Sequence, residues 1–353
     1  MLEKPARLAD VAKAAGVSQG TASNVFSRPD VVRAEVRERV LATAAAIGYT
    51  GPDPKGRLLR AGKVNAIGVV TGEPLDYFFE DPYARTFLAH LARACDGYGA
   101  GLSLVSARNV DGPAWNIQSA LVDGFIILCL DNPNQLVALT QVRQLPYVAI
   151  TDSLADVTVP AIGIDNYTPA LAAGRHIIEL GHRRLAVLAL PMMGKFVGHL
   201  HERGLRRVTY ADARDRIRGY RDAAAEVGIA PEAVPVFQTM MDAPSVATCL
   251  ETLFSQPEPP TALLAQSDSI ALLAMAWLKA RGLSVPGDVS VIGFDGATEA
   301  EVSNPPLTTM VQPYEQMTRL AAQAVLAPAS GEPLKALLPA RLVVRQSTAA
   351  PRP

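Results

Sequence analysis

The chain lacks the patterns that mark secreted, membrane-spanning and zinc-stabilised proteins. Its 353 residues include only three cysteines, widely spaced and without a CxxC pair, so neither a disulfide framework nor a zinc knuckle is indicated. No apolar run approaches the roughly 18 residues that a membrane span requires, and the N-terminal segment MLEKPARLAD has no apolar signal-peptide core. We therefore expect a protein of the reducing cytoplasm with no membrane partner.

What the chain does contain is typical of a globular protein with more than one domain. Hydrophobic residues make up 49% of the sequence and charged residues 19%, and at roughly 100 to 200 residues per domain the length fits two or three domains. Charge is unevenly distributed, because residues 1–60 contain ten Lys and Arg against six acidic residues, whereas the remainder contains 23 against 28. A basic head on an acidic body favours a polyanionic partner for the head.

Residues 1–51 are predicted to form three short helices with a tight turn between the first two. The apolar positions recur at helical spacing in each helix: Leu8, Val11, Ala12 and Ala15, then Ala22, Val25 and Phe26, then Val36, Val40, Ala44 and Ile47. Gly16 ends the first helix, Ser18 can cap the second, and the third covers about residues 33–47. This pattern predicts an all-α helix-turn-helix domain that binds DNA.

The outward face of the second helix carries side chains that suit DNA. The amides of Gln19 and Asn24 match adenine in the major groove, at about 1 to 3 kcal/mol per good contact. Gly20 lies on the same face and costs helix stability, which fits either close backbone approach to DNA or no role at all. The hydroxyls predicted to hold phosphates are those of Ser18, Thr21 and Ser23. A generic three-helix bundle with solvated amides is the alternative.

The same turn also matches a hydrolase motif. Residues 16–20 read G-x-S-x-G, the pattern of a nucleophile elbow, which needs a strand before the serine and a helix after it. Here a helix precedes the serine, so a serine hydrolase is not predicted.

The order and spacing of short strings along nearly the whole chain resemble the LacI/GalR family of bacterial transcriptional repressors. The strings that carry the resemblance include LADVAKAAGVS at 8–18, TASNV at 21–25, AIGY at 46–49, AIGVV at 66–70, VDGFI at 122–126, GHRR at 181–184, PGDVSVIGFD at 286–295, PLTT at 306–309 and RQST at 345–348. The resemblance implies that Gln19, Gly20 and Asn24 are the positions that read bases.

The resemblance also implies a hinge helix within residues 52–62 that orders on operator DNA. Its leucine matches Leu59 and would wedge into the minor groove, at an unstacking cost that the bend recovers through new contacts. Lys55, Arg57 and Arg60 suit the flanking phosphates. The residues themselves indicate a proline-punctuated linker that is too short for a stable free helix, in which Leu59 could equally pack on the body.

From Ala66 onward, short apolar runs alternate with helical stretches, which is typical of parallel α/β units. Strands are predicted at 66–70, 101–106, 124–130, 147–151, 184–189, 262–265 and 289–293. No GxGxxG or P-loop pattern follows a strand, so no nucleotide cofactor is expected.

The resemblance implies two doubly wound parallel-sheet subdomains of the periplasmic-binding-protein type, between which the chain crosses three times. They form an effector-binding and dimerisation domain over residues 63–345, followed by a tail at 346–353. The first subdomain is expected at about 63–165 plus 296–327, and the second at about 166–295 plus 328–345.

Candidate ligand-binding residues follow predicted strands, because open α/β sheets bind ligands beyond the carboxyl ends of their strands. Asp152, Arg216 and Asp295 match the effector-binding positions of the family. Further candidates are Ser267 and Asp268 after one strand and Phe79 and Asp81 in an aromatic loop. An arginine fork with carboxylates suits a hydroxyl-rich or zwitterionic small molecule, although each carboxylate could instead cap a helix or form a turn.

Two other features argue against specific ligands. Where many relatives carry a stacking ring, residues 239–242 read Thr-Met-Met-Asp, so a flat ring ligand is not favoured. His199 and His201, in a polar insertion, are expected to be solvated rather than to bind a metal.

The sequence therefore predicts a ligand-responsive transcriptional regulator, most simply a repressor. It would bind a near-palindromic operator as a homodimer, and a sugar or similar polar metabolite would control its affinity for DNA. A small-molecule binding protein without a DNA role is the alternative, and an enzyme is not expected because no base lies beside a nucleophile in the predicted cleft. Whether the metabolite induces or corepresses is left open.

Overall fold

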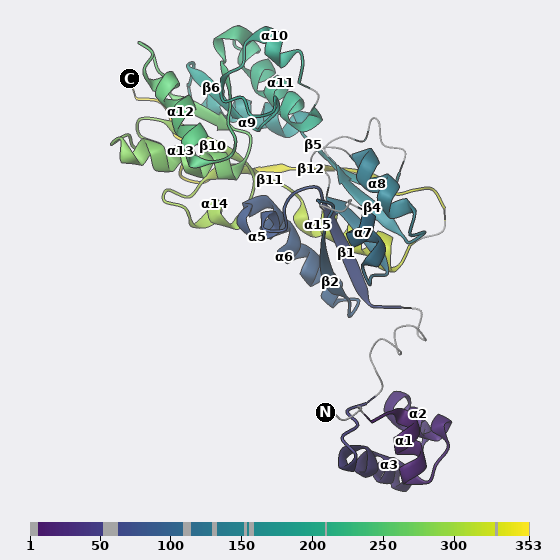
Figure 1. Ribbon diagram of the computed structural model, residues 1–353. Coiled ribbons are helices and arrows are strands. Elements are labelled where there is room, and N and C mark those ends of the chain that lie inside the picture. The colour runs from purple at the N-terminus through teal and green to yellow at the C-terminus, as the bar shows by residue number, and fades with distance from the viewer. Residues whose placement is uncertain are drawn as a thin grey trace. The chain divides into compact units, whose positions relative to one another are not determined.

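The computed structural model describes residues 6–51, 63–108, 114–128, 133–151, 154, 159–208, 210–328 and 331–352. The chain divides into two compact units, Met1–Val64 and Asn65–Pro353 (Figure 1). In the described part, no helix combines the length and the apolar character that crossing a membrane requires.

The N-terminal unit is the predicted helix-turn-helix. It consists of α1 (Leu8–Ala15), α2 (Gln19–Ser27), a 3₁₀ turn η1 (Pro29–Val31) and α3 (Ala34–Ala46). The predicted apolar stripes meet in one small core around Val11, Val25 and Val40, which Phe26 and Tyr49 extend by edge-to-face packing with centroids 5.5 Å apart. Ile47 was predicted to point inward and is 37% exposed, because α3 ends at Ala46 and Ile47 leaves the helical register.

The first sheet of the larger unit is parallel throughout, with strand order β12-β5-β4-β3-β1-β2. Its strands are β1 (Ala66–Thr71), β2 (Gly101–Ser106), β3 (Gly124–Leu128), β4 (Tyr147–Thr151), β5 (Ala161–Asp165) and β12 (Lys335–Pro339). Helices α6 (Pro82–Asp96) and α15 (Tyr314–Leu326) share a core with one face, and α7 (Ala114–Ser119) and α8 (Pro133–Gln141) share a core with the other. Helices on both faces make this a doubly wound layer.

The second sheet has strand order β13-β11-β10-β9-β6-β8-β7, in which the edge strands β7 and β13 run antiparallel to their neighbours. Its strands are β6 (Leu185–Ala189), β7 (Gly198–His199), β8 (Val236–Gln238), β9 (Ala262–Ala265), β10 (Ser290–Asp295), β11 (Thr308–Val311) and β13 (Arg341–Val343). One face packs on α9 (Tyr167–Glu179) and α11 (Ala211–Ala225), and the other on α12 (Ala243–Phe254) and α13 (Asp268–Ala280). Short helices α5 (Tyr77–Glu80), α10 (Glu202–Leu205) and α14 (Thr298–Val302) and the turn η2 (Pro231–Ala233) lie in the connections.

The chain crosses between the two sheets three times, as the resemblance implied, but two of the crossings differ from the predicted boundaries. The crossings follow β5, β11 and β12. Residues 296–327 were expected in the first subdomain, which is wrong for β11, because β11 pairs with β10 in the second sheet. Residues 328–345 were expected in the second subdomain, which is wrong for β12, because β12 pairs with β5 in the first sheet. A short strand's own residues do not reveal which sheet its backbone joins, because the pairing is made with residues far away in the chain.

Residues that follow position 345 were predicted as a tail and instead belong to the second sheet's layer. Ser347 is fully buried. Its Oγ accepts a hydrogen bond from the Thr308 amide at 2.8 Å and donates one to the Val291 carbonyl at 2.6 Å. His182 contacts the Ala349 carbonyl through Nε2 at 2.8 Å. The boundary at 345 is therefore too early, because Ser347 and Ala349 supply hydrogen-bond partners to buried groups of this layer.

Candidate functional site

The exposed face of α2 carries the residues that were predicted to read DNA. Gln19, Gly20 and Asn24 are exposed, and Ser23 is half-buried on the same helix. The residues of the opposite face, Ala22 and Val25, are buried in the core. Since α2 has a solvated polar face at its N-terminal end, its geometry is compatible with entry into a major groove.

Ser18 caps this helix, as the sequence predicted. Its Oγ accepts a hydrogen bond from the Thr21 amide at 3.0 Å and lies 2.8 Å from Thr21 Oγ1. The cap fixes where α2 begins, and both hydroxyls remain near the solvent-facing end of the helix. Their predicted contact with phosphates is therefore sterically open.

The two glycines of the turn and helix differ in their backbone needs. Gly16 has φ +65° and ends α1 in the left-handed conformation, which L-residues with side chains seldom adopt. Gly20 has an ordinary helical backbone, and a Cβ placed there would meet only Ser18 Oγ at 3.8 Å. The fold of this unit thus requires glycine at position 16 but not at position 20.

Five predicted site residues lie outside the described residues. They are the hinge candidates Lys55, Arg57, Leu59 and Arg60 and the effector candidate Asp152.

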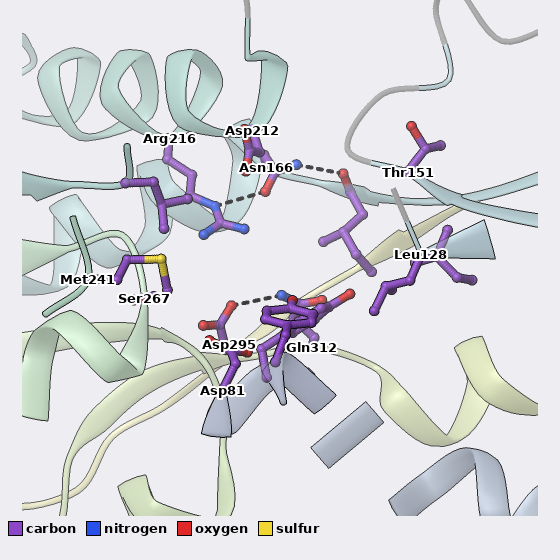
Figure 2. A pocket seen from close by; sticks show the side chains of 15 residues that line it. Asp81, Leu128, Thr151, Asn166, Asp212, Arg216, Met241, Ser267, Asp295 and Gln312 are labelled. Atoms are coloured by element: carbon purple, nitrogen blue, oxygen red, sulfur yellow. Dashed lines mark hydrogen bonds between the residues drawn. The ribbon is translucent and has the colours of Figure 1, made fainter. Parts of the chain in front are cut away.

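A cavity of about 110 Å³ lies in the larger unit where the carboxyl ends of both sheets meet (Figure 2). Thr151 ends β4 and Asp295 ends β10, while Asn166 and Gln312 directly follow β5 and β11. Parallel strands of both sheets therefore deliver the lining residues from far-apart positions in the chain, as open α/β sheets do for ligands.

Arg216, the predicted effector-binding arginine, reaches the cavity from α11 and is 5% exposed. Its Nε donates to Asn166 Oδ1 at 2.9 Å (Figure 2). Its Nη1 donates to the Gln266 carbonyl, and its guanidinium lies 3.7 Å from the centroid of the Phe294 ring. These contacts hold the guanidinium plane in one orientation. Such a preorganised fork can bind an oxygen-bearing ligand with little loss of conformational entropy.

Asp295, also predicted, lines the cavity opposite the arginine. Its Oδ1 accepts a hydrogen bond from Gln312 Nε2 at 2.9 Å. Burial raises the pKa of the Asp295 carboxyl well above its usual range, and the nearby Arg216 charge acts in the opposite direction. The residue adopts φ +127°, an unfavourable region for aspartate, so the sharp turn into Gly296 places this carboxyl at a cost in backbone strain.

Asp81 and Ser267 line the cavity, as the ligand-binding prediction requires, and each also caps a helix, as the alternative for the carboxylates states. Asp81 Oδ1 accepts from the Ala84 amide at 2.9 Å at the start of α6, and Ser267 Oγ accepts from the Ile270 amide at 3.2 Å at the start of α13. Burial raises the pKa of Asp81. The caps fix both side chains at the cavity wall.

Asp268 and Phe79 are not part of the described cavity wall, in contrast to the prediction. Asp268 is fully buried behind it, where its carboxylate accepts hydrogen bonds from Thr309 Oγ1 at 2.5 Å and from the Gly296 and Ala297 amides at 2.8 and 2.7 Å. Its oxygens are thereby committed to holding the turn after Asp295. Phe79 is 63% exposed, because the short helix α5 turns Tyr77 to the cavity and Phe78 to the core.

Several lining residues were missed from the sequence. Asn166 and Gln312 follow β5 and β11, which were not predicted, and Leu190 follows β6, which was, so applying the strand-end rule to every strand would have found them. Met241 lies in the stretch 239–242, which the sequence had already placed where relatives contact the ligand. β5 and β11 have only five and four residues and neither forms a long apolar run, which hid them. Asp212 lies near the start of α11, where no local pattern signals a ligand.

His199 and His201 lie against each other in and beside β7, with ring centroids 4.4 Å apart, and His199 stacks on Phe237. Burial and the neighbouring His201 lower the pKa of His199. Both are exposed, and no group of three potential metal ligands occurs among the residues that the structure describes.

Comparison with family models gives two matches. Residues 7–51 match the model for bacterial regulatory proteins of the lacI family, and residues 175–348 match that for a periplasmic binding protein-like domain. The first covers the helix-turn-helix unit and the second covers most of the second subdomain together with α15 and β12.

Similar proteins extend along almost the whole chain. A helix-turn-helix transcriptional regulator of Mycobacterium tuberculosis is 37% identical over 354 residues, which cover 98% of this chain and 97% of the relative. The structure of the transcriptional regulator CelR in complex with cellobiose is similar with a TM-score of 0.67 and 27% identity, covering 97% of this chain and 99% of that one. The lac repressor dimer bound to operator and an anti-inducer is similar with a TM-score of 0.76 and 26% identity, covering 98% and 100%.

Proposed function

The chain belongs to the lacI family of bacterial regulatory proteins and is a ligand-responsive transcriptional regulator, and on this premise we propose that it represses transcription from a near-palindromic operator as a homodimer. One observation carries the proposal: a single chain combines an exposed amide-bearing face on a capped second helix with a buried cavity whose arginine and aspartate are held in fixed positions. The first feature suits DNA and the second suits a small polar ligand. Neither the exposed helix face nor the cavity is a feature that indicates catalysis.

Base reading is assigned to Gln19, Gly20 and Asn24, with Ser18, Thr21 and Ser23 on phosphates. The exposure of the two amides supports this assignment, because each can form two hydrogen bonds with an adenine edge. Residues 52–62 form the hinge in this proposal, with Leu59 in the minor groove and Lys55, Arg57 and Arg60 on the backbone. Two-fold symmetry of the homodimer then matches the symmetry of the operator.

The effector is a small polar metabolite such as a sugar, held by Arg216 and Asp295 with support from Asp81 and Ser267. The structure of CelR with cellobiose shows that a similar protein binds a sugar. Carboxylates, an arginine fork and amides together form the hydrogen-bonding set that recognises hydroxyl groups. Asp152 completes this set in the proposal.

Effector binding is coupled to DNA through the crossings between the two sheets. Asn166 and Gln312 stand at the first and second crossings, and their side-chain amides bond Arg216 and Asp295. A ligand that changes the position of either charge therefore acts directly on a segment that joins the subdomains. The coupling is reciprocal, so operator binding changes effector affinity by the same factor.

The proposed division of the chain is a DNA-binding domain at 1–51, a hinge at 52–62 and an effector-binding and dimerisation domain from residue 63. The second subdomain is extended to residue 349 to include the hydrogen bonds of Ser347 and Ala349. The place of action is the cytoplasm, at the nucleoid, with no cofactor.

Selection of bound sequences from a random duplex pool by the purified full chain, at a stated salt concentration, tests the proposal. Recovery of a near-palindrome whose binding a metabolite pool weakens is the expected result. Strengthened binding in the presence of the pool would replace induction by corepression. No recovery with or without metabolites would contradict the repressor function and favour a binding protein without a DNA role.

A further inference from the structure

A second, wider recess of about 810 Å³ adjoins the cavity and forms its vestibule. The two hollows share the wall residues Tyr77, Asp81, Leu190, Asp212 and Met241. A ligand that approaches the cavity from this side passes the vestibule first, so the charges there act on it before Arg216 does.

The vestibule is lined by five carboxylates and, among the described residues, by no Lys, Arg or His. The carboxylates are those of Glu73, Asp76, Glu80, Asp81 and Asp212. None of the five forms a salt bridge with another described residue. Arg85, in α6, forms its salt bridge with Glu299 and donates hydrogen bonds to the Phe79 and Glu80 carbonyls. Arg85 partly offsets the charge of Asp81, and the other four carboxylates leave the vestibule negative. Charges of one sign in a concave surface raise the local concentration of cations and lower that of anions.

The hydrogen-bonding groups of the inner cavity favour a ligand that donates hydrogen bonds. Gln312 Oε1 is buried and has no hydrogen-bond partner within the described chain, although Gln312 itself is 5% exposed and lines the cavity. A buried acceptor without a donor destabilises the protein, and a donor group on a ligand would remove that cost. Carboxylates also outnumber the single arginine in the wall, so a ligand that donates hydrogen bonds meets further acceptors there.

From these two independent observations we infer that the effector is a donor-rich, polyhydroxylated molecule that carries no negative charge, and that the vestibule excludes its phosphate and carboxylate derivatives. The inference rests on the proposed effector function of this cavity and specifies its ligand. A phosphate group carries up to about two negative charges, which the five carboxylates of the vestibule would repel and which only one arginine in the cavity could neutralise. The regulator thus responds to a metabolite before a kinase reaction phosphorylates it rather than to the product.

The test separates a bacterial small-molecule extract on ion-exchange resins into anionic, neutral and cationic pools. Each pool is added to the full chain, and the midpoint of thermal unfolding and the affinity for the selected operator are measured. We expect the neutral or cationic pool to raise the midpoint, and the anionic pool to do so only after phosphatase treatment. Stabilisation by the anionic pool that phosphatase abolishes would overturn the inference.

The other outcomes separate the inference from the proposed function. If a neutral or cationic pool stabilises the protein without changing operator affinity, the ligand class stands and the regulatory coupling fails. If no pool changes either quantity, the effector function fails and the inference fails with it.

Variants at the vestibule rim give a second, quantitative arm. Once the stabilising compound is isolated, its phosphate ester should bind the wild type at least about tenfold more weakly at low salt. The double substitution Asp76→Asn with Glu80→Gln should reduce the ratio of the affinities for the compound and its phosphate ester by about threefold or more. Glu258→Gln, at an exposed carboxylate that is not part of the vestibule wall, is the matched control. An unchanged ratio in the double variant would refute the role of the vestibule.

Discussion

Gln312 is bonded twice to Asp295: its side-chain Nε2 donates to Asp295 Oδ1 at 2.9 Å, and its backbone amide donates to the Asp295 carbonyl at 2.9 Å. Gln312 stands where the chain leaves the second sheet for α15, which packs on the first. Asn166, at the crossing before α9, makes the corresponding bond with Arg216. Arg216 and Asp295 are therefore each linked to a segment that connects the two subdomains.

Substitution of the cavity arginine should weaken effector binding and spare DNA binding. Arg216→Lys keeps the charge but loses the planar fork, and charge-assisted hydrogen bonds are worth about 1.5 to 3 kcal/mol each, so effector affinity should fall about tenfold or more. Titration of operator release measures this. Arg218→Lys, on the exposed side of the same helix over the Tyr167 ring, is the control and should respond as the wild type. Equal affinity in both variants would mean that Arg216 does not contact the effector.

The double substitution Gln19→Ala with Asn24→Ala should abolish sequence preference while leaving salt-dependent, nonspecific binding intact. Loss of two amide contacts at about 1 to 3 kcal/mol each predicts a fall of about tenfold or more for operator DNA alone. Binding to operator and to scrambled duplex at several salt concentrations measures it. Ser27→Ala, exposed at the far end of α2, should leave the preference unchanged. An equal loss for every sequence would show that the reading face is elsewhere.

Gly20→Ala should stabilise α2 by up to about 1 kcal/mol, because the added methyl has room and alanine is the better helix former. The slowing of amide hydrogen exchange in α2 of the full chain measures this. We expect the same variant to weaken or redirect operator binding. Gly16→Ala should have the opposite effect on stability, since position 16 has φ +65°. Unaltered operator binding by Gly20→Ala would contradict a close backbone approach to DNA.

The buried carboxylate of Asp268 predicts a specific pH dependence of stability. Burial raises the pKa of Asp268 to about 6, so the native state holds the proton more tightly than the unfolded chain does. Ionisation of this group therefore lowers the free energy of unfolding as the pH rises from about 4 to about 6. Asp268→Asn removes that ionisation, and its free energy of unfolding should increase relative to wild type by up to about 3 kcal/mol across this window.

Denaturant unfolding of the wild type and Asp268→Asn at several pH values checks the prediction. Asp242→Asn is the control, because the Ser245 hydroxyl and amide lower the pKa of that helix cap and its effect has the opposite sign. A wild-type minus Asp268→Asn difference that is flat between pH 4 and 6 would contradict the assignment.

Ser347→Ala should destabilise the larger unit by about 1 to 3 kcal/mol. The substitution leaves the buried Thr308 amide without its acceptor and the Val291 carbonyl without its donor. Thermal or denaturant unfolding measures the change. Gln346→Ala, at the exposed neighbouring position, should alter stability by less than about 0.5 kcal/mol. Equal stabilities would show that residues after 345 are a tail after all.

The sequence by itself determined the features that depend on local periodicity and on short-range chemistry. The three helices of the head, the cap at Ser18 and the turn at Gly16 follow from residues within a few positions of one another. The strands at 101–106, 147–151 and 262–265 were predicted with the bounds that the structure has, since each is a short apolar run between helical stretches. Arg216 and Asp295 were placed at the cavity by the match to family positions and by the strand-end rule.

Only the tertiary structure decided which strands share a sheet and which carboxylates face a ligand. Asp268 and Asp295 both lie at strand ends in the sequence, yet the first is consumed by the Gly296 and Ala297 amides and the second lines the cavity. Tyr77 and Phe79 are two residues apart, and one short helix sends them to opposite environments. The pairing of β12 with β5, and the place of Gln312 beside Asp295, depend on contacts between segments distant in the chain, and no local pattern encodes such contacts.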